Sequence, residues 1–159
     1  MSPIPDPIQS VPEETARVAR AANPKGNPYI LFRDELDRIG EDEDFAKLFQ
    51  EHDLLPLYSW RLALVTILQF RENLTDQQAA EAVQGRINVK YLLGLELTDP
   101  GFDFSVLSEY RSHLLQGSAE RLLLEQLVER CRPFGLLKTR GKQQVDTDYV
   151  LEKIQKLNS

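Results

Sequence analysis

One segment, residues 60–72, carries apolar side chains on nearly every side of the helix that its spacing predicts. Ser59 can cap the start of this helix, because a serine hydroxyl accepts a hydrogen bond from a first-turn amide. The apolar positions are Leu62, Ala63, Leu64, Val65, Ile67, Leu68 and Phe70. A helix that is apolar nearly all round has to be buried among other elements. We therefore expect a central helix over residues 60–72, surrounded by the rest of the fold.

Amphipathic helices on both sides of this segment can supply the surrounding layer. A serine or threonine followed three residues later by Glu or Gln predicts a helix start, and this pattern occurs at Ser10 and Thr75. Ser118 is expected to cap a helix whose apolar stripe reaches Cys131. The expected further helices are 10–22, 29–40, 43–50, 75–85, 88–93, 105–117 and 119–132. With 159 residues, 42% of them apolar and 28% charged, the chain is predicted to form one compact, mainly α, multi-helix domain.

The pattern changes after Gly135. Residues 143–149 are predicted to form a strand, with Val145 and Thr147 on one face and Asp146 and Asp148 on the other. Two carboxylates on one strand face can bind a single hard cation, although without acids from other strands the pair is only a polar strand face. Residues 150–157 have helical spacing. Because a lone strand has no paired edge, we expect this tail to be mobile or loosely packed.

Charge and composition exclude several classes of protein. No run approaches ~18 consecutive apolar residues, so no membrane-spanning helix is expected. The first residues lack the pattern of a secretory signal, and one cysteine excludes an internal disulfide. The net charge of −6 comes entirely from residues 33–53, where nine acids meet three bases. Residues 130–142 contain five bases and no acid, so a basic segment is available to an acidic partner.

The pair of helices over residues 75–93 has the arrangement of a helix-turn-helix, whose short second helix enters the DNA major groove. Asn88 and Lys90 are expected to point outward, with Arg86 in the turn within reach of phosphate. The alternative is an ordinary packing corner, because two short helices around a glycine are common. His52 and His113 show no ligand-like spacing and are interpreted as surface or core residues, while Cys131 and Trp60 are interpreted as core.

Several segments of the chain resemble the N-terminal part of bacterial insertion-sequence transposases of the DDE class, those with an InsH-type N-terminal domain. The resemblance covers essentially the whole chain, and its segments occur in family order. They are Val11–Arg17, Pro24–Tyr29, Trp60–Val65, Gln69–Phe70, Leu74–Asp76, Ala79–Ala80, Tyr91–Phe102, Ser105–Arg111 and Gly135–Lys138.

The resemblance implies a helical DNA-binding domain that leads into an RNase H-like catalytic domain. In this family a strand after a basic, glycine-containing turn carries the first of three metal-binding carboxylates, and Asp146 falls at that position. The complete family enzyme uses Mg²⁺ there. Asp148 and Tyr149 depart from the family pattern, and the second Asp and the Glu would lie beyond Ser159. We therefore expect a truncated transposase with one or two strands of an incomplete catalytic domain.

The resulting division is an extended arm over residues 1–9, a helical DNA-binding domain over 10–134 and the start of a catalytic domain over 135–159. The residues expected to contact DNA are Arg86, Asn88, Lys90, Lys138, Arg140 and Lys142. The expected partners are the terminal inverted repeats of a transposon, another copy of the chain or a full-length transposase, in the bacterial cytoplasm at the nucleoid. Two alternatives remain: a protein-interaction module without a DNA role, and a transposase completed in trans by a second chain.

Overall fold

The computed structural model describes residues 10–39, 59–138 and 145–159, and this part of the chain is mainly helical and contains no strand. The expected arm over 1–9 and the expected helix over 43–50 lie outside the described residues. The α-helices are α1 (Glu13–Ala22), α2 (Pro28–Ile39), α4 (Ser59–Glu72), α5 (Asp76–Gly85), α6 (Ile87–Leu93), α7 (Ser105–Ser112), α8 (Ala119–Cys131) and α9 (Thr147–Leu157). A 3-10 turn, η1 (Arg132–Phe134), follows α8.

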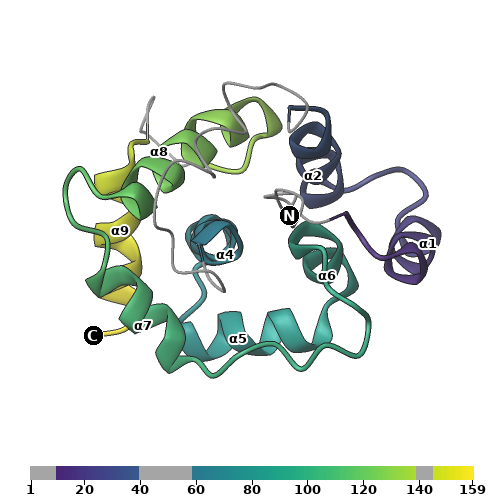
Figure 1. The fold of residues 1–159 in the computed structure, drawn as a ribbon, viewed down its shortest axis with the longest axis horizontal. Coiled ribbons are helices and arrows are strands. Elements are labelled where there is room, and N and C mark those ends of the chain that lie inside the picture. Colours follow the sequence, from purple (N-terminus) through teal and green to yellow (C-terminus); the bar gives the residue numbers. More distant parts are fainter. Residues whose placement is uncertain (1–9, 40–58, 139–144) are drawn as a thin grey trace, which may run out of the picture.

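The prediction of a central helix is confirmed by α4. Figure 1 looks along α4 and shows α2, α6, α5, α7, α9 and α8 arranged around it, with α1 outside this ring beside α2 and α6. All residues from Leu62 to Phe70 are buried, including the polar Thr66 and Gln69. The Thr66 hydroxyl donates to the Leu62 carbonyl at 2.8 Å. Each side of α4 therefore faces another helix, as its all-round apolar sequence requires.

Of the four predicted helix caps, those at Thr75 and Ser118 are present, whereas Ser59 is itself the first residue of α4 and Ser10 does not cap α1. Thr75 and Gln78 form the complete capping box at the start of α5, and the Ser118 hydroxyl accepts from the Arg121 amide at 3.2 Å. By contrast, Pro12 is the N-cap residue of α1, and no side-chain hydrogen bond caps this helix. Because α1 begins at Glu13, Ser10 lies two residues before the N-cap position and does not cap the helix.

The strand expected over residues 143–149 is wrong for the part that the structure describes. Asp146 is instead the N-cap residue of α9, and Thr147 begins that helix. The buried side chains Thr147, Val150 and Ile154 follow helical spacing along one stripe. Residues 145–148 alternate between two sets of side chains, which suggested a strand. This stretch is too short to distinguish the two-residue period of a strand from the longer period of a helix.

The C-terminal helix α9 is also packed more closely than expected. Val150 and Ile154 are fully buried, and α9 packs against α4 and α8. Tyr149 meets Phe70 of α4 edge-on, with ring centroids 5.9 Å apart. Arg121 of α8 donates to Asp148 at 2.6 Å. Residues 145–159 thus form part of the layer around α4 rather than a loosely packed tail.

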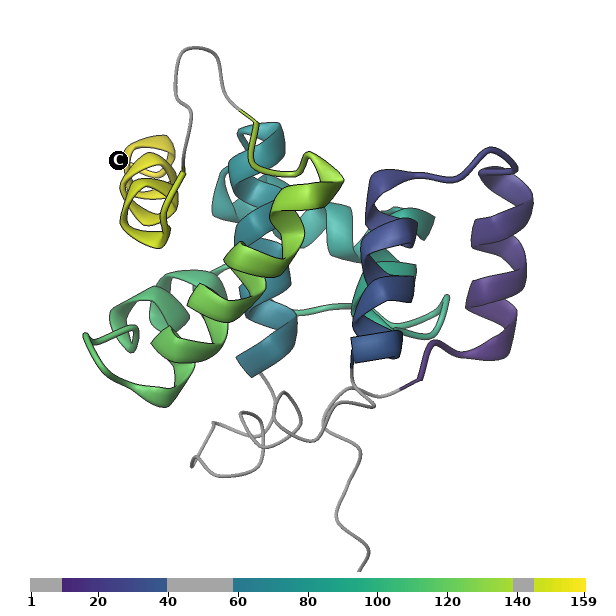
Figure 2. The same ribbon diagram turned by 90° about the horizontal axis from the view of Figure 1, so that it is seen from above.

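The carboxyl end of α4 is a meeting point of several segments. In Figure 2 this end of α4 lies at the upper edge, near the start of α2 and the segment that follows α8. Arg71 in the last turn of α4 donates to the Gly135 carbonyl at 3.0 Å, which fixes the segment after α8 against α4. None of the described helices combines the length and apolarity needed to cross a membrane.

Candidate nucleic-acid interface

The second helix of the predicted helix-turn-helix pair is buried. Residues Val89 to Leu93 of α6 are all buried, and α6 packs against α1, α2, α4 and α5. Lys90, which was expected to point outward, is only 3% exposed. Its Nζ donates to the Asp99 carbonyl at 2.6 Å, and burial lowers the pKa of its amine. The outward orientation of Lys90 is therefore wrong, because α6 has neighbours on most of its circumference.

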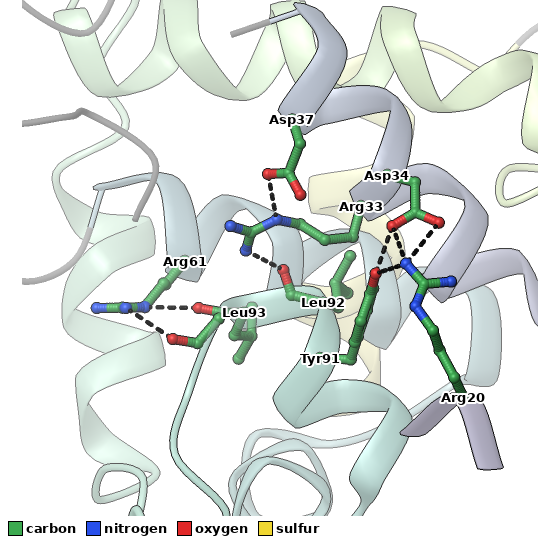
Figure 3. Close-up of polar contacts among 9 residues, drawn as sticks. Arg20, Arg33, Asp34, Asp37, Arg61, Tyr91, Leu92 and Leu93 are labelled. Atoms are coloured by element: carbon green, nitrogen blue, oxygen red, sulfur yellow. Dashed lines mark hydrogen bonds and ion pairs between the residues drawn. The ribbon is translucent and has the colours of Figure 1, made fainter. Parts of the chain in front are cut away.

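Two arginines hold the carboxyl end of α6 (Figure 3). Arg33 of α2 is completely buried and donates to the Leu92 carbonyl at 3.0 Å. Arg61 of α4 donates to the Leu93 carbonyl at 2.8 Å. Both guanidinium groups lie against the Trp60 ring, at 5.3 Å and 4.7 Å from its centroid. Cations at a helix carboxyl end satisfy its unpaired carbonyls and complement its dipole, so these arginines fix α6 in place.

A second polar cluster in Figure 3 joins α1 to α2 and α6. Arg20 of α1 donates to Asp34 of α2 at 3.0 Å and to the Tyr91 hydroxyl at 2.5 Å. The Tyr91 hydroxyl in turn donates to Asp34. Burial, together with the bond to Asp34, raises the pKa of Tyr91 to about 12. Sequence reasoning missed both clusters, because their partners are distant along the chain.

The other two residues of the predicted pair lie at the surface, at the amino end of α6. Arg86 and Asn88 line an open hollow of about 460 Å³ together with Asn27, Pro28, Tyr29, Arg71 and Glu72. Within the described residues, the Asn88 side chain makes no hydrogen bond. The hollow is large compared with the ~30 Å³ that one water molecule occupies, so it can admit a solvated group from a partner.

Glu72 holds Arg86 at one side of this hollow. The two groups form a bidentate pair, with Arg86 Nη1 at 2.7 Å and Nη2 at 3.0 Å from the two carboxylate oxygens. The Tyr29 hydroxyl donates to the same carboxylate at 2.5 Å. Burial alone would raise the pKa of Glu72, but the bonds from Arg86 and Tyr29 outweigh it and hold this pKa below its usual value. Glu72 is therefore a carboxylate at neutral pH.

Basic side chains from four segments gather around this end of α4. Arg71 and Arg86 line the hollow. Lys138 is exposed. Its side chain lies beside Gly135, with Cε 3.7 Å from where a Cβ on this glycine would be. Arg71 donates to the carbonyl of the same glycine. Lys153 of α9 donates to the Phe70 carbonyl at 3.3 Å. We call Arg71, Arg86, Lys138 and Lys153 the α4-end patch.

The patch suits an anionic partner, and it also has a structural effect. Cations near the carboxyl end of a helix are favoured by the helix dipole, which helps to explain why four bases can lie close together. Asn88 adds an amide that can donate to an anion or to a base edge. Arg140 and Lys142, the remaining bases predicted to contact DNA, lie outside the described residues.

Asp146 is not part of a metal site in the described residues. Its Oδ1 accepts from the Tyr149 amide at 2.8 Å as the cap of α9, and Asp148 pairs with Arg121. The described parts of the chain contain no group of three His, Cys, Asp or Glu side chains placed to bind a metal ion. The shared strand face expected for Asp146 and Asp148 is thus replaced by helix-cap geometry.

The remaining candidates for reactive side chains are ordinary in their surroundings. Cys131 is buried, its thiol bonds the Val128 carbonyl at 3.2 Å, and burial raises its pKa to about 12. His113 is exposed, and His52 lies outside the described residues. Trp60 is partly buried and packs on the core. The interpretations of Cys131, His113 and Trp60 as core or surface residues are confirmed.

The described residues form a small helical domain in which four basic side chains gather near the carboxyl end of α4. A comparison with known protein families identifies the family of this domain. The chain belongs to the transposase domain family (DUF772), whose model matches residues 17–113, more than half of the chain. The match runs from α1 to the end of α7, so α8 and α9 lie outside it. No curated protein and no solved structure matches the chain.

Proposed function

We propose that this chain is the DNA-binding part of an insertion-sequence transposase of the DDE class and binds the terminal inverted repeats of its element. Membership of the transposase domain family supports a role in transposition. The observation that carries the DNA-binding part is the α4-end patch, where four bases from separate segments lie near the carboxyl end of α4. Two of them, Arg71 and Arg86, line a hollow at the surface. Phosphate contacts from Lys and Arg supply most of the affinity of proteins for DNA.

In this proposal the Arg and Lys side chains of the α4-end patch contact the DNA backbone. Asn88 is the side chain best suited to recognise a nucleotide base. Asparagine can pair with an adenine edge. The predicted contact through Lys90 is not retained, since its amine is bound to the Asp99 carbonyl inside the fold. Lys138 continues along the sequence to Arg140 and Lys142, and we propose that this basic segment lies along phosphate as well. The nucleoid is then the place where the chain acts.

The proposal concerns binding, and Mg²⁺-dependent catalysis remains an expectation of the resemblance alone. Partners other than DNA are part of the same proposal. A second copy of the chain or a full-length transposase would bind beside it at the paired ends of an element.

A gel-shift titration tests the proposal. One duplex contains the terminal inverted repeat of the parent element, and a second duplex of the same length has a scrambled sequence. We expect a shift on both duplexes at low salt, tighter on the repeat, that weakens steeply as salt is added. No shift on either duplex at low ionic strength would refute the proposal. Sedimentation with and without DNA separates the alternative, since a dimer that ignores DNA would favour a protein-interaction module.

A charge-matched pair of variants locates the binding surface. Arg71→Gln combined with Lys138→Gln removes two charges from the α4-end patch. Arg17→Gln combined with Arg38→Gln removes two exposed charges that do not line the hollow. The logarithmic salt slope is expected to fall by about two in the first double variant and to stay unchanged in the second. Equal losses in both double variants would show that the patch is not the contact surface.

A further inference from the structure

The pairing of Glu72 with Arg86 has the geometry of an arginine bound to a phosphate. Both carboxylate oxygens accept from the two terminal nitrogens of Arg86, at 2.7 Å and 3.0 Å. Arginine binds carboxylate and phosphate through the same parallel pair of donors. Glu72 therefore occupies the position at which an oxyanion from outside would meet Arg86.

This pair is accessible, unlike the contact of Arg33 at the carboxyl end of α6. The side chains of Arg86 and Glu72 are 36% and 28% exposed, whereas Arg33 is completely buried. The pair borders the hollow of about 460 Å³ that Arg71 and Asn88 also line. An incoming phosphate can thus approach Arg86 from solvent and meet further donors on the same wall.

We propose that the hollow binds one backbone phosphate of the DNA, and that Glu72 competes with this phosphate for Arg86 and so lowers the affinity of the chain for DNA. The inference rests on the proposed function and adds an internal competitor to it. When a phosphate enters, it replaces the carboxylate as the partner of Arg86, while Arg71 and Asn88 donate to its remaining oxygens. Glu72 keeps the Tyr29 hydroxyl as its partner, so its charge is not left without a hydrogen bond.

A double-mutant cycle tests the competition directly. Glu72→Gln removes the charge and leaves an amide oxygen that can still accept from Tyr29. Arg86→Gln removes the contested cation, and the double variant removes both. Glu109→Gln is the matched control, since Glu109 is an exposed acid of α7 that does not line the hollow. Circular dichroism and a thermal melt establish that each variant is folded before DNA binding is measured by fluorescence anisotropy.

We expect Glu72→Gln to bind duplex DNA about three- to fivefold more tightly than the wild type, the range set by loss of a partly exposed ion pair. Its logarithmic salt slope is expected to stay close to that of the wild type, because Arg86 contacts phosphate in the bound state of both proteins. In the Arg86→Gln background the same substitution is expected to have no effect beyond that of Glu109→Gln. This dependence on Arg86 separates competition from a general change in net charge.

The outcomes distinguish the inference from the proposed function. If the wild type binds DNA and Glu72→Gln behaves like Glu109→Gln, the competition is refuted and the DNA-binding role stands. A gain from Glu72→Gln that persists without Arg86 also refutes it. If the wild type binds no duplex at low salt, the proposed function and the competition both fail.

Discussion

Replacement of Arg33 by methionine is expected to destabilise the fold by about 2–4 kcal/mol. The guanidinium is fully buried and donates to the Leu92 carbonyl at the end of α6. Loss of this donor leaves a buried acceptor unsatisfied, which costs about 1–3 kcal/mol. The contact with the Trp60 ring is worth roughly 0.5–2 kcal/mol. Asp37, the ion-pair partner, is 44% exposed, so water can replace Arg33 there at little cost.

Urea unfolding followed by circular dichroism measures this loss. With a slope of about 2 kcal/mol per molar urea, the midpoint is expected to fall by about 1–2 M. Arg38→Met is the control on the same helix, since the Arg38 side chain is 70% exposed, and its midpoint is expected to change little. An Arg33→Met midpoint equal to that of Arg38→Met would refute the conclusion that Arg33 holds α6 in the core.

Three further predictions concern other parts of the fold. Leu127→Ala in α8 is expected to cost about 2–5 kcal/mol, because the side chain is wholly buried, and a thermal melt unchanged within error would contradict this. Asp76→Asn is expected to make stability less sensitive to acid. Burial alone would raise the pKa of Asp76, but bonds from Arg111 and Gln69 hold this pKa below its usual value. The contribution of Asp76 is therefore present above its unfolded pKa and lost as pH falls through its folded pKa. Urea midpoints compared between neutral and acidic pH are the measurement, and equal pH dependence in wild type and variant would rule the idea out. Asp146→Ala is expected to lose about 0.5–2 kcal/mol of stability as the cap of α9 and to bind DNA as the wild type does; weaker binding by a fully folded variant would show that Asp146 touches the DNA.

The features that could be predicted from the sequence depend on neighbouring residues. The capping box of Thr75 and Gln78 lies within four residues. The apolar side chains on the different sides of α4 all come from one continuous segment of the sequence. Local hydrogen-bond chemistry and helical spacing are enough to identify both. Ser10 fitted the same pattern, but Pro12 is the N-cap residue of α1, and no side-chain hydrogen bond caps this helix.

The features that could not be predicted depend on partners far along the chain. Arg33 bonds a carbonyl 59 residues away, and no spacing rule connects such positions. Lys90 looks like an exposed cation in the sequence, yet α6 is enclosed by helices from several regions. For α9, the signal was available: Asp146 precedes a run in which Thr147, Val150 and Ile154 share a helical stripe. The two candidate contacts at the surface, Arg86 and Asn88, do line one hollow.

The enclosure of α4 has a consequence for the chain during its synthesis. The ribosome makes α4 before α8 and α9, which cover part of its circumference in the finished fold (Figure 1). Until α9 has left the ribosome, the apolar helix α4 has no permanent cover on the sides that α8 and α9 later occupy. Exposed apolar surface of this kind is what chaperones bind. The nascent chain is therefore expected to depend on such protection until α9 is complete.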